Sequence, residues 1–312
     1  MFNINTKKAF KISVIAYAAL ILVGLIFSIV LGPKLDINFA GGTKLSYSYK
    51  GDVAEKDFTA AVKEVLGKQD FKVSKNKAVS GDNTTFTISI ADKSLSKAKL
   101  DAISAKLKEN FKKNNFELSE SNSVSETVGT TFFLKSLVAV LLTAIFVVAY
   151  VGVRFRKIGG VTAALTALVA LALDLMVSFF ICVIFRLQID TNYMAVVLTI
   201  LGYSLNDTIV IYDRVRENKK LYPELTLQEN MDNSVNTTMK RNIVTTTTTI
   251  LAVITIIVVS ELFGLTTLRT FAIPMAFGLI SGCVSSLFVA GPLWVMWRTK
   301  LDAKRAKNNA GF

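Results

Sequence analysis

Six long runs of mostly apolar residues follow one another along the chain, and polar segments separate them. They occupy residues 12–31, 132–153, 159–185, 192–212, 242–263 and 270–297. A helix of about 20 apolar residues crosses the hydrocarbon core of a bilayer, so each run is long enough to span it. Because 52% of the 312 residues are hydrophobic, the pattern predicts a polytopic α-helical membrane protein with six transmembrane helices.

The segment between the first two runs, residues 32–128, has a different pattern. Alternation of apolar and polar positions predicts strands in "KLSYSY", "FKVSKNKAV", "TTFTISIA" and "FELSESNSV". The stretches "AEKDFTAAVKEVL" and "SKAKLDAISAKLKENF" predict amphipathic helices, and "SGDN" predicts the turn between the middle strands. The order β-α-β-β-α-β is that of a ferredoxin-like α+β domain. The segment lacks a glycine-rich phosphate loop and a nucleophile–base pair, so we expect a structural or interaction role.

Charge sets the orientation of this arrangement. Lysine and arginine gather beside alternate ends of the runs: Lys7, Lys8 and Lys11; Arg154, Arg156 and Lys157; Arg214, Arg216, Lys219, Lys220, Lys240 and Arg241; Arg298, Lys300, Lys304, Arg305 and Lys307. Basic residues favour the cytoplasmic side, which predicts that both termini are cytoplasmic. The net charge of +13 is then mainly a topology signal, and no nucleic-acid partner is expected.

These patterns divide the chain into four parts. Residues 1–31 form a cytoplasmic N-terminus and the first transmembrane helix, and residues 32–128 form an extracytoplasmic domain. Residues 129–297 form a five-helix transmembrane bundle, and residues 298–312 form a basic cytoplasmic tail. We expect the first helix to be a retained signal anchor, because it is long enough to span and lacks a small-residue cleavage site.

The absence of histidine restricts the chemistry. It removes the usual zinc sites and Ser-His-Asp catalysis, and any proton relay must use carboxylates. We expect no metal, no cofactor and no enzymatic activity. Cys182 and Cys283 both lie within apolar runs, where free cysteine is typically a small packing residue.

A few polar residues interrupt the predicted spans. Asp174 lies near the middle of the third span, Asn206 and Asp207 lie in the fourth, and Arg241 opens the fifth before the run "TTTTT". An aspartate at the centre of a membrane helix costs about 2.5–3.5 kcal/mol on insertion scales. Two interpretations remain open: a paired carboxylate that fixes helix packing, or a carboxylate that changes protonation during transport. A moving arginine partner would favour the second, because burial disfavours the charged form and a nearby cation favours it.

Small residues indicate where helices pack closely. Gly278 and Gly282 form a G-x-x-x-G pair in the sixth span, which is typical of close helix contacts. Gly202 and Ser204 are expected to let another helix approach Asp207. After the fourth span, the stretch that begins with Asp213, Arg214 and Arg216, together with "PELTLQENMDNSVNTTMK", is interpreted as a polar, helical cytoplasmic loop.

Several of these segments resemble the SecD/SecF family of translocase subunits, which is part of the resistance-nodulation-division (RND) superfamily. The stretch "GYSLNDTIVIYDRVREN" closely resembles the family's fourth-span signature, and "INFAGGTKL", with Gly41 and Gly42, resembles its glycine-pair motif at the membrane–domain junction. The third-span aspartate, the arginine before a threonine-rich fifth span and "GLISGCVSSLFVAGPL" also fit. The resemblance covers nearly the whole chain.

Two positions depart from the family pattern. The family often has Asp-Phe-Thr before the glycine pair, where this chain has Asn38-Phe39-Ala40. The third-span aspartate often follows histidine, but here it follows Leu173. Asp174 therefore lacks a neighbouring titratable group, which weakens the case for it as a relay.

The resemblance implies an auxiliary subunit of the Sec protein translocase in the bacterial cytoplasmic membrane. Its implied partners are SecD, the SecYEG channel, the YidC insertase, the translocating polypeptide and the lipid bilayer. With SecD, it would use the proton gradient to assist export. The residues expected along the proton path are Asp207, Arg241 and Asp174, with Asn206 holding a hydrogen bond near Asp207.

Three other functions remain open. An RND-type exporter of a small molecule or lipid shares the fold, although one compact outer domain leaves little room for a drug-binding cleft. A passive scaffold of the translocon would use the same charges only to hold an interface. An intramembrane aspartyl protease would need a G-x-G-D partner for the pair Tyr212-Asp213, and the sequence has none.

Overall fold

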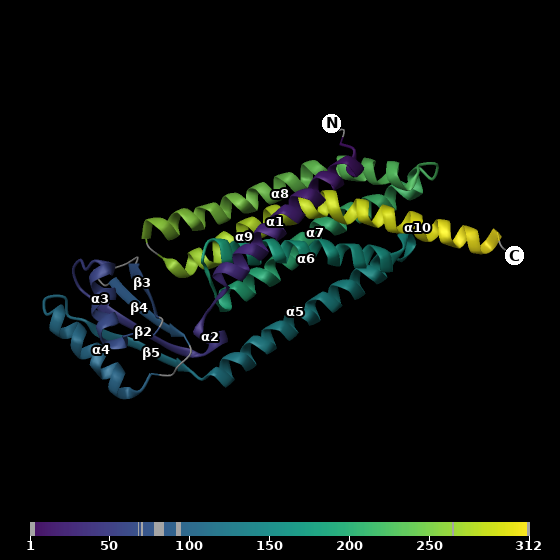
Figure 1. Cartoon of the computed structure of the whole chain (residues 1–312). Helices are drawn as coiled ribbons and strands as arrows, with labels where there is room; N and C mark the ends of the chain where they lie inside the picture. The colour runs from purple at the N-terminus through teal and green to yellow at the C-terminus, as the bar shows by residue number, and fades with distance from the viewer. Residues whose placement is uncertain are drawn as a thin grey trace.

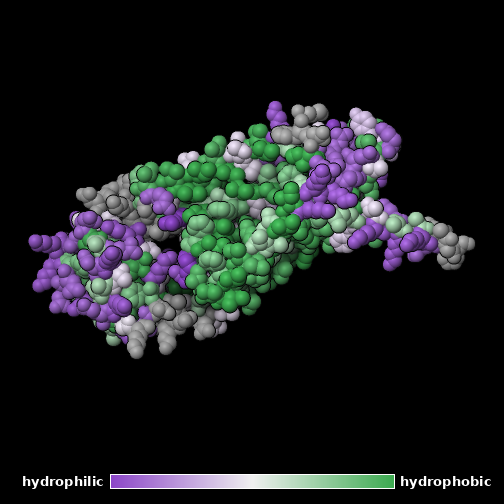
Figure 2. All heavy atoms as spheres, turned by 45° about the horizontal axis from the view of Figure 1, so that its top comes forward, coloured by the Kyte–Doolittle hydropathy of each residue, from purple (hydrophilic) through white to green (hydrophobic). Residues whose placement is uncertain are grey.

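A bundle of long helices carries a small α+β domain at one end in the computed structural model (Figure 1). The structure describes residues 4–67, 69, 71–77, 84–91, 95–263 and 265–310. Apolar residues form a continuous belt over the bundle, and hydrophilic residues gather on the domain and at the opposite end (Figure 2). This distribution suits a molecule whose middle lies in lipid.

Six helices of the described chain are long and apolar enough to cross a membrane, which confirms the predicted number. They are α1 (Thr6–Leu31), α5 (Glu126–Arg154), α6 (Gly160–Ile184), α7 (Thr191–Leu221), α8 (Leu227–Phe263), and a sixth built from α9 (Thr266–Ser285), a π-helical turn (Ser286–Ala290) and α10 (Gly291–Ala310). A short 3₁₀ helix, Arg156–Ile158, joins α5 to α6. More than half of the apolar window is buried in α6 and in the sixth span, against 11% in α1 and α5. The inner helices are therefore α6 and α9, and α1 and α5 lie at the periphery.

Several helices extend beyond the apolar runs. Helix α7 continues to Leu221 and α8 already begins at Leu227, so only a short turn joins them. Asp213, Arg214 and Arg216 consequently lie in the last turns of α7. The predicted helical character of this polar segment is confirmed, but its helices are the continuations of two membrane helices and not a separate loop. Thr226 and Glu229 form a reciprocal capping box before α8, with Thr226 N 2.9 Å from Glu229 Oε2 and Glu229 N 3.2 Å from Thr226 Oγ1. Hydropathy marks only the lipid-embedded part of a helix. The capping box starts α8 well before that part, so the helix is longer than the apolar run.

The domain contains the predicted β-α-β-β-α-β order. Its elements are β2 (Gly42–Tyr49), α3 (Glu55–Leu66), β3 (Phe71–Lys77), β4 (Thr84–Ala91), α4 (Lys97–Asn110) and β5 (Glu117–Val124). The strands form an antiparallel sheet in the order β3-β4-β2-β5, which is the ferredoxin-like arrangement. The expected "SGDN" turn at residues 80–83 lies outside the described residues.

Stacked aromatic rings form the centre of the domain core. The ring of Tyr49 lies 4.8 Å from those of Phe86 and Phe116, and the rings of Phe58 and Phe86 are 4.2 Å apart. All four side chains are almost fully buried. The rings come from β2, α3, β4 and the residue before β5, so they tie the sheet to its helices.

A short parallel pairing joins the domain to the bundle. Strand β1 (Lys34–Leu35), which follows α1, pairs with β6 (Gln188–Ile189), which follows α6. Helix α2 (Ile37–Ala40) then leads to Gly41 and Gly42, whose φ angles are 81° and 132°. A Cβ on Gly42 would overlap the carbonyl oxygen of Ile90, and a Cβ on Gly129 of α5 would lie 2.7 Å from Gly41 N. The glycine pair thus lies where the chain enters the sheet beside α5.

Candidate functional site

Asp174 is fully buried near the middle of α6 and is surrounded by hydroxyl groups. Ser281 Oγ of α9 donates a 2.6 Å hydrogen bond to Asp174 Oδ1. Ser204 Oγ of α7 and Ser285 Oγ of α9 donate to Asp174 Oδ2 at 2.6 and 2.9 Å. Hydrogen bonds to a carboxylate stabilise its charged form. The carboxylate therefore has three hydrogen-bond donors from two other helices.

Tyr17 extends this cluster to the periphery of the bundle. Its hydroxyl lies 2.9 Å from Ser281 Oγ and 3.0 Å from the Ser281 carbonyl oxygen. Tyr17 belongs to α1, so the cluster joins four elements: α1, α6, α7 and α9. Gly282, one residue after Ser281, keeps the approach to Asp174 open, because a Cβ there would lie 3.0 Å from the Ser204 Cβ.

A row of hydroxyl groups continues along α7, away from the domain. Ser204, Thr208 and Tyr212 are spaced four residues apart and therefore share one helix face. Thr208 Oγ1 lies 2.9 Å from Ser286 Oγ, and Tyr212 OH lies 2.8 Å from Thr166 Oγ1 of α6. All of these residues are buried. The row leads from the level of Asp174 toward the end of the bundle where both termini lie (Figure 1).

The π-helical turn Ser286–Ala290 faces this row. Ser286 Oγ donates to the Ser204 carbonyl oxygen at 3.1 Å, and Tyr212 OH donates to the Ala290 carbonyl oxygen at 3.3 Å. A π turn displaces the backbone from the regular helical pattern and frees polar groups for other partners. The irregular turn therefore supplies a donor to the Ser204 backbone carbonyl and an acceptor to the Tyr212 side chain of α7.

Asp207 lies three residues after Ser204 and is also buried. Its Oδ2 atom is buried without a hydrogen bond to any part of the chain that the structure describes. The polar groups acting on it come from α8, namely Thr246 and the positive charge of Arg241. The Arg241 side chain is itself exposed, and no salt bridge of the described residues joins it to Asp207. This pair is therefore in electrostatic range without direct contact.

The structure does not place Asn206 and Gly202 in the roles expected for them near Asp207. Asn206 is exposed on the outer face of α7, and no hydrogen bond within the described chain joins it to Asp207, because adjacent helical residues point about 100° apart. Gly202 lies on the same outward face, and a Cβ there would have no neighbour within 4 Å. Gly202 therefore packs against no described helix of this chain. In contrast, Cβ atoms on Gly278 and Gly282 would press into Ile200 and Ser204 of α7, so this pair does permit close packing.

The basic end of α7 is held by ion pairs. Asp213 forms salt bridges with Arg216 at 2.8 Å and with Arg154 of α5 at 3.3 Å, and Arg214 pairs with Glu217 at 2.8 Å. Exposed pairs of this kind contribute at most about 1 kcal/mol each. Of the three residues predicted there, Asp213 therefore joins α7 to the end of α5, while Arg214 and Arg216 pair within α7.

The serine donors are the site residues that sequence analysis missed. Ser281 and Ser285 are four residues apart, beside Gly278 and Gly282. In the sequence they cannot be distinguished from small packing residues. The available signal was the hydroxyl spacing Ser204–Thr208–Tyr212 opposite a lone membrane aspartate.

The family comparison agrees with this architecture. Residues 103–300 match the family model described as "Protein export membrane protein SecD/SecF, C-terminal", which is well over half of the chain. The chain belongs to the SecD/SecF family. Within the SecD/SecF family, similar curated proteins include the protein translocase subunits SecF of Sebaldella termitidis and Gemmatimonas aurantiaca. The first is 31% identical over 280 residues, covering 89% of this chain and 86% of that protein; the second is 32% identical over 296 residues, covering 90% and 84%.

Longer SecD/SecF proteins contain a region that is similar to this chain. The protein translocase subunit SecDF of Bacillus subtilis is 30% identical over 288 residues, which cover 90% of this chain and 36% of that protein. The crystal structure of SecDF, a translocon-associated membrane protein from Thermus thermophilus, has the same fold with a TM-score of 0.77 at 24% identity. The match covers 96% of this chain and 39% of that one. The chain thus spans about two fifths of the solved SecDF protein.

Proposed function

We propose that the chain is an auxiliary subunit of the Sec protein translocase that acts with SecD and uses the proton gradient to assist polypeptide export. Two membrane carboxylates, Asp174 and Asp207, would exchange protons, and the hydroxyl row along α7 would connect them with the side that holds the termini. The buried cluster around Asp174 carries this proposal, because a passive scaffold does not need an ionisable group at that depth.

The orientation follows from charge. The basic residues lie at the bundle end that holds both termini, and we assign this end to the cytoplasm of a bacterium. The ferredoxin-like domain then lies outside, where it can contact the translocating polypeptide.

SecD is the proposed membrane partner. The outward face of α7 with Gly202 and Asn206, and the exposed Arg241 of α8, are sites that a second membrane half can cover. The fusion of both subunits in SecDF relatives supports this arrangement. The SecYEG channel and the YidC insertase are proposed as further partners through the Sec pathway.

The free energy released by one proton crossing the membrane limits how far it can drive a movement of the outer domain. Each proton contributes about 2.3 kcal/mol per 100 mV of membrane potential, whereas reversal of a two-state population needs about 5.5 kcal/mol. A full movement of the outer domain would therefore use more than one proton.

The decisive experiment follows precursor-to-mature conversion of an exported protein by pulse-chase. Cells depleted of their own SecF receive this chain with a matched SecD, at equal membrane levels of each variant. We expect Asp207→Asn and Asp174→Asn to lose most of the stimulation of export, and Asp213→Asn, at the helix end, to retain it. Full activity of both membrane variants would favour a passive scaffold instead. If wild type supports export poorly while transporting a small molecule, the exporter function would replace the proposal.

A further inference from the structure

A cavity of about 580 Å³ lies between the ferredoxin-like domain and the bundle, at the outer ends of α1 and α6. Its walls combine apolar side chains, including Ile37 and Phe71, with three cations: Lys34, Lys72 and Arg186. The three cations come from separate parts of the fold. Lys34 lies in β1 after α1, Arg186 follows α6, and Lys72 lies in β3, an edge strand of the domain.

Arg186 is fixed in this cavity by the end of α1. Its Nη1 atom donates to the carbonyl oxygens of Leu31 and Gly32 at 2.7 and 2.9 Å. These contacts use backbone acceptors, so the guanidinium charge is not neutralised. No salt bridge of the described residues includes Lys34, Lys72 or Arg186. The cavity is therefore lined by positive charges that lack a contacting anion within the described chain.

The cations repel one another. Partial burial lowers the pKa of Lys34, and the neighbouring Arg186 charge lowers it further. Partial burial also lowers the pKa of Lys72, and the charges of Lys34, Arg269 and Arg186 act in the same direction. Asp36 opposes this effect on Lys72 without neutralising it. An anion bound among the cations would remove this repulsion.

An apolar path leads to the cavity from the membrane. At the end of α1, the side chains of Ile29 and Val30 are 85% and 73% exposed, and Leu35 beyond them is 38% exposed. The hydrophobic belt of the bundle extends to the domain (Figure 2). The cations thus lie just beyond the apolar surface, at the depth where phospholipids place their phosphate groups.

We propose that this cavity binds the phosphate group of an anionic phospholipid from the leaflet that faces the domain. Lys34 and Arg186 hold the phosphate from the bundle, Lys72 holds it from the domain, and the acyl chains lie along the end of α1. The lipid thereby links the domain to the bundle in the arrangement of Figure 1. The phosphate chemistry does not depend on proton coupling; only the identity of the leaflet rests on the proposed orientation.

A lipid suits the cavity better than an acidic peptide. The cations lie next to lipid-facing side chains, and the apolar part of the wall would remain uncovered by a charged peptide. Basic pockets between membrane helices at the cytoplasmic side bind anionic head groups, and this cavity presents the same chemistry at the opposite helix ends.

Native mass spectrometry of the detergent-purified full chain tests the proposal. Phosphatidylglycerol, phosphatidylcholine and inorganic phosphate are titrated separately, and bound adducts are counted for wild type and for the double variant Lys34→Gln/Lys72→Gln. We expect one phosphatidylglycerol to bind wild type, and the double variant to bind it about 30-fold more weakly, about fivefold for each lysine. Lys56→Gln/Lys63→Gln is the matched control: it changes the net charge equally, on the exposed surface of α3, and should bind as wild type does.

Each alternative result has a clear meaning. Equal lipid binding by both double variants, or equally tight binding of phosphatidylcholine, would overturn the proposal. Inorganic phosphate that binds as tightly, with the same dependence on the two lysines, would keep the anion site and remove the lipid from it. Displacement of phosphatidylglycerol by micromolar polyglutamate would assign the cavity to an acidic peptide. Lys72→Gln alone, in the edge strand β3, should melt at the wild-type temperature and bind phosphatidylglycerol about fivefold more weakly, which separates lost binding from lost folding.

Discussion

Asp174 of α6 and Ser204 of α7 are joined by a 2.6 Å hydrogen bond in the middle of the membrane bundle. Ser281 and Ser285 donate two further bonds to the same carboxylate. A protonated carboxylic acid has its own hydrogen to donate, so at least one serine hydroxyl must turn away when Asp174 takes up a proton. Proton uptake at α6 is thereby coupled to the hydroxyl groups of α7 and α9.

This coupling can be measured by a double-mutant cycle in detergent. We expect Ser281→Ala to lower the free energy of unfolding by about 1.5–3 kcal/mol, because it removes a donor from a charged group. In an Asp174→Asn background the same change should cost about 0.5–1.5 kcal/mol, the value for neutral partners. Equal costs in both backgrounds would contradict a charged Asp174 in the resting protein.

Close contact between α5 and α6 depends on one glycine. A Cβ on Gly160 would overlap the backbone carbonyl of Gly152, whereas a Cβ on Gly152 would have no neighbour within 4 Å. Gly160→Ala should therefore destabilise the protein by about 1–3 kcal/mol through overpacking, measured as a lower melting temperature in detergent. Gly152→Ala is the control and should be neutral or slightly stabilising. An unchanged melting temperature in Gly160→Ala would show that α5 can move away without cost.

The aromatic stack predicts how the domain responds to core mutations. Phe86 lies against Tyr49, Phe58 and Phe116. Phe86→Ala should lower the free energy of unfolding of the domain by about 3–5 kcal/mol. Limited proteolysis of the full chain should then cut within residues 42–124 much faster than in wild type. Leu118→Ala changes a half-exposed side chain of β5 and should leave the cleavage rate nearly unchanged. If the two variants were cleaved at the same rate, the stack would not be the main stabilising element.

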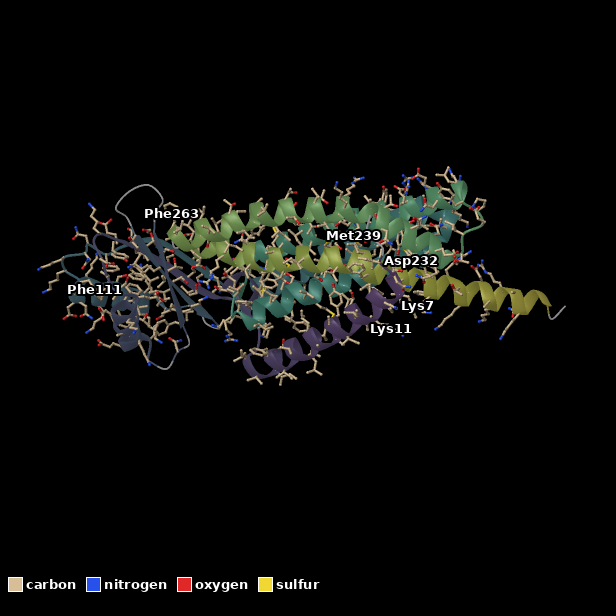
Figure 3. All side chains as sticks on the ribbon, turned by 90° about the horizontal axis from the view of Figure 1, so that it is seen from above. Lys7, Lys11, Phe111, Asp232, Met239 and Phe263 are labelled. Atoms are coloured by element: carbon tan, nitrogen blue, oxygen red, sulfur yellow. The ribbon has the colours of Figure 1, made fainter. Side chains whose placement is uncertain are left out.

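The first described residues, from Ile4 onward, are bound to the polar extension of α8. Asn236 exchanges hydrogen bonds with the backbone of Ile4 at 2.9 and 3.0 Å, and Asp232 accepts from Thr6 N at 3.0 Å. Asp232 and Lys7 lie at the same end of the bundle, far from Phe263 at the domain end of α8 (Figure 3). These bonds fasten the start of α1 to the end opposite the domain.

Hydrogen exchange should detect the loss of this attachment. Asn236→Ala should speed exchange of the Ile4 and Thr6 amides about 5- to 30-fold, as expected for a local opening that becomes easier by 1–2 kcal/mol. Asn233→Ala is the matched control, because its side chain is exposed on another face of the same helix. Similar exchange in all three proteins would mean that packing alone holds the N-terminal segment.

The fold was largely predictable because its patterns are local. The six spans follow from long, mostly apolar runs, and the order of the domain follows from alternation in segments such as Gly42–Tyr49. The polar segment before the fifth span was expected to be helical, but its continuity with that span from Leu227 onward was not predicted, because a polar helical extension has no apolar run to mark it. The pairing of β1 with β6 joins residues more than 150 positions apart through two residues on each side. Strands this short show no recognisable alternation of apolar and polar residues in the sequence.

The candidate site was predictable only in part. Asp174 and Asp207 are visible as charges in apolar runs, since lipid makes them costly. Their partners are not visible in the same way, because Ser281, Ser285 and Tyr17 come from other helices and serine is common at helix contacts. The outward direction of Asn206 depends on the rotation of α7, which is set by packing against α9 and not by the local sequence.

The π-helical turn sets the rotation of α10 relative to α9 in the sixth span. A π turn amounts to one residue inserted into an α-helix, so α10 is rotated by about 100° relative to an uninterrupted continuation of α9. Deleting one residue between Ser286 and Ala290 would restore a regular helix and turn Trp294, now buried, toward a different neighbour. If the π turn moved along the span, only the helical segment that it passed would rotate, while the helix on either side kept its register.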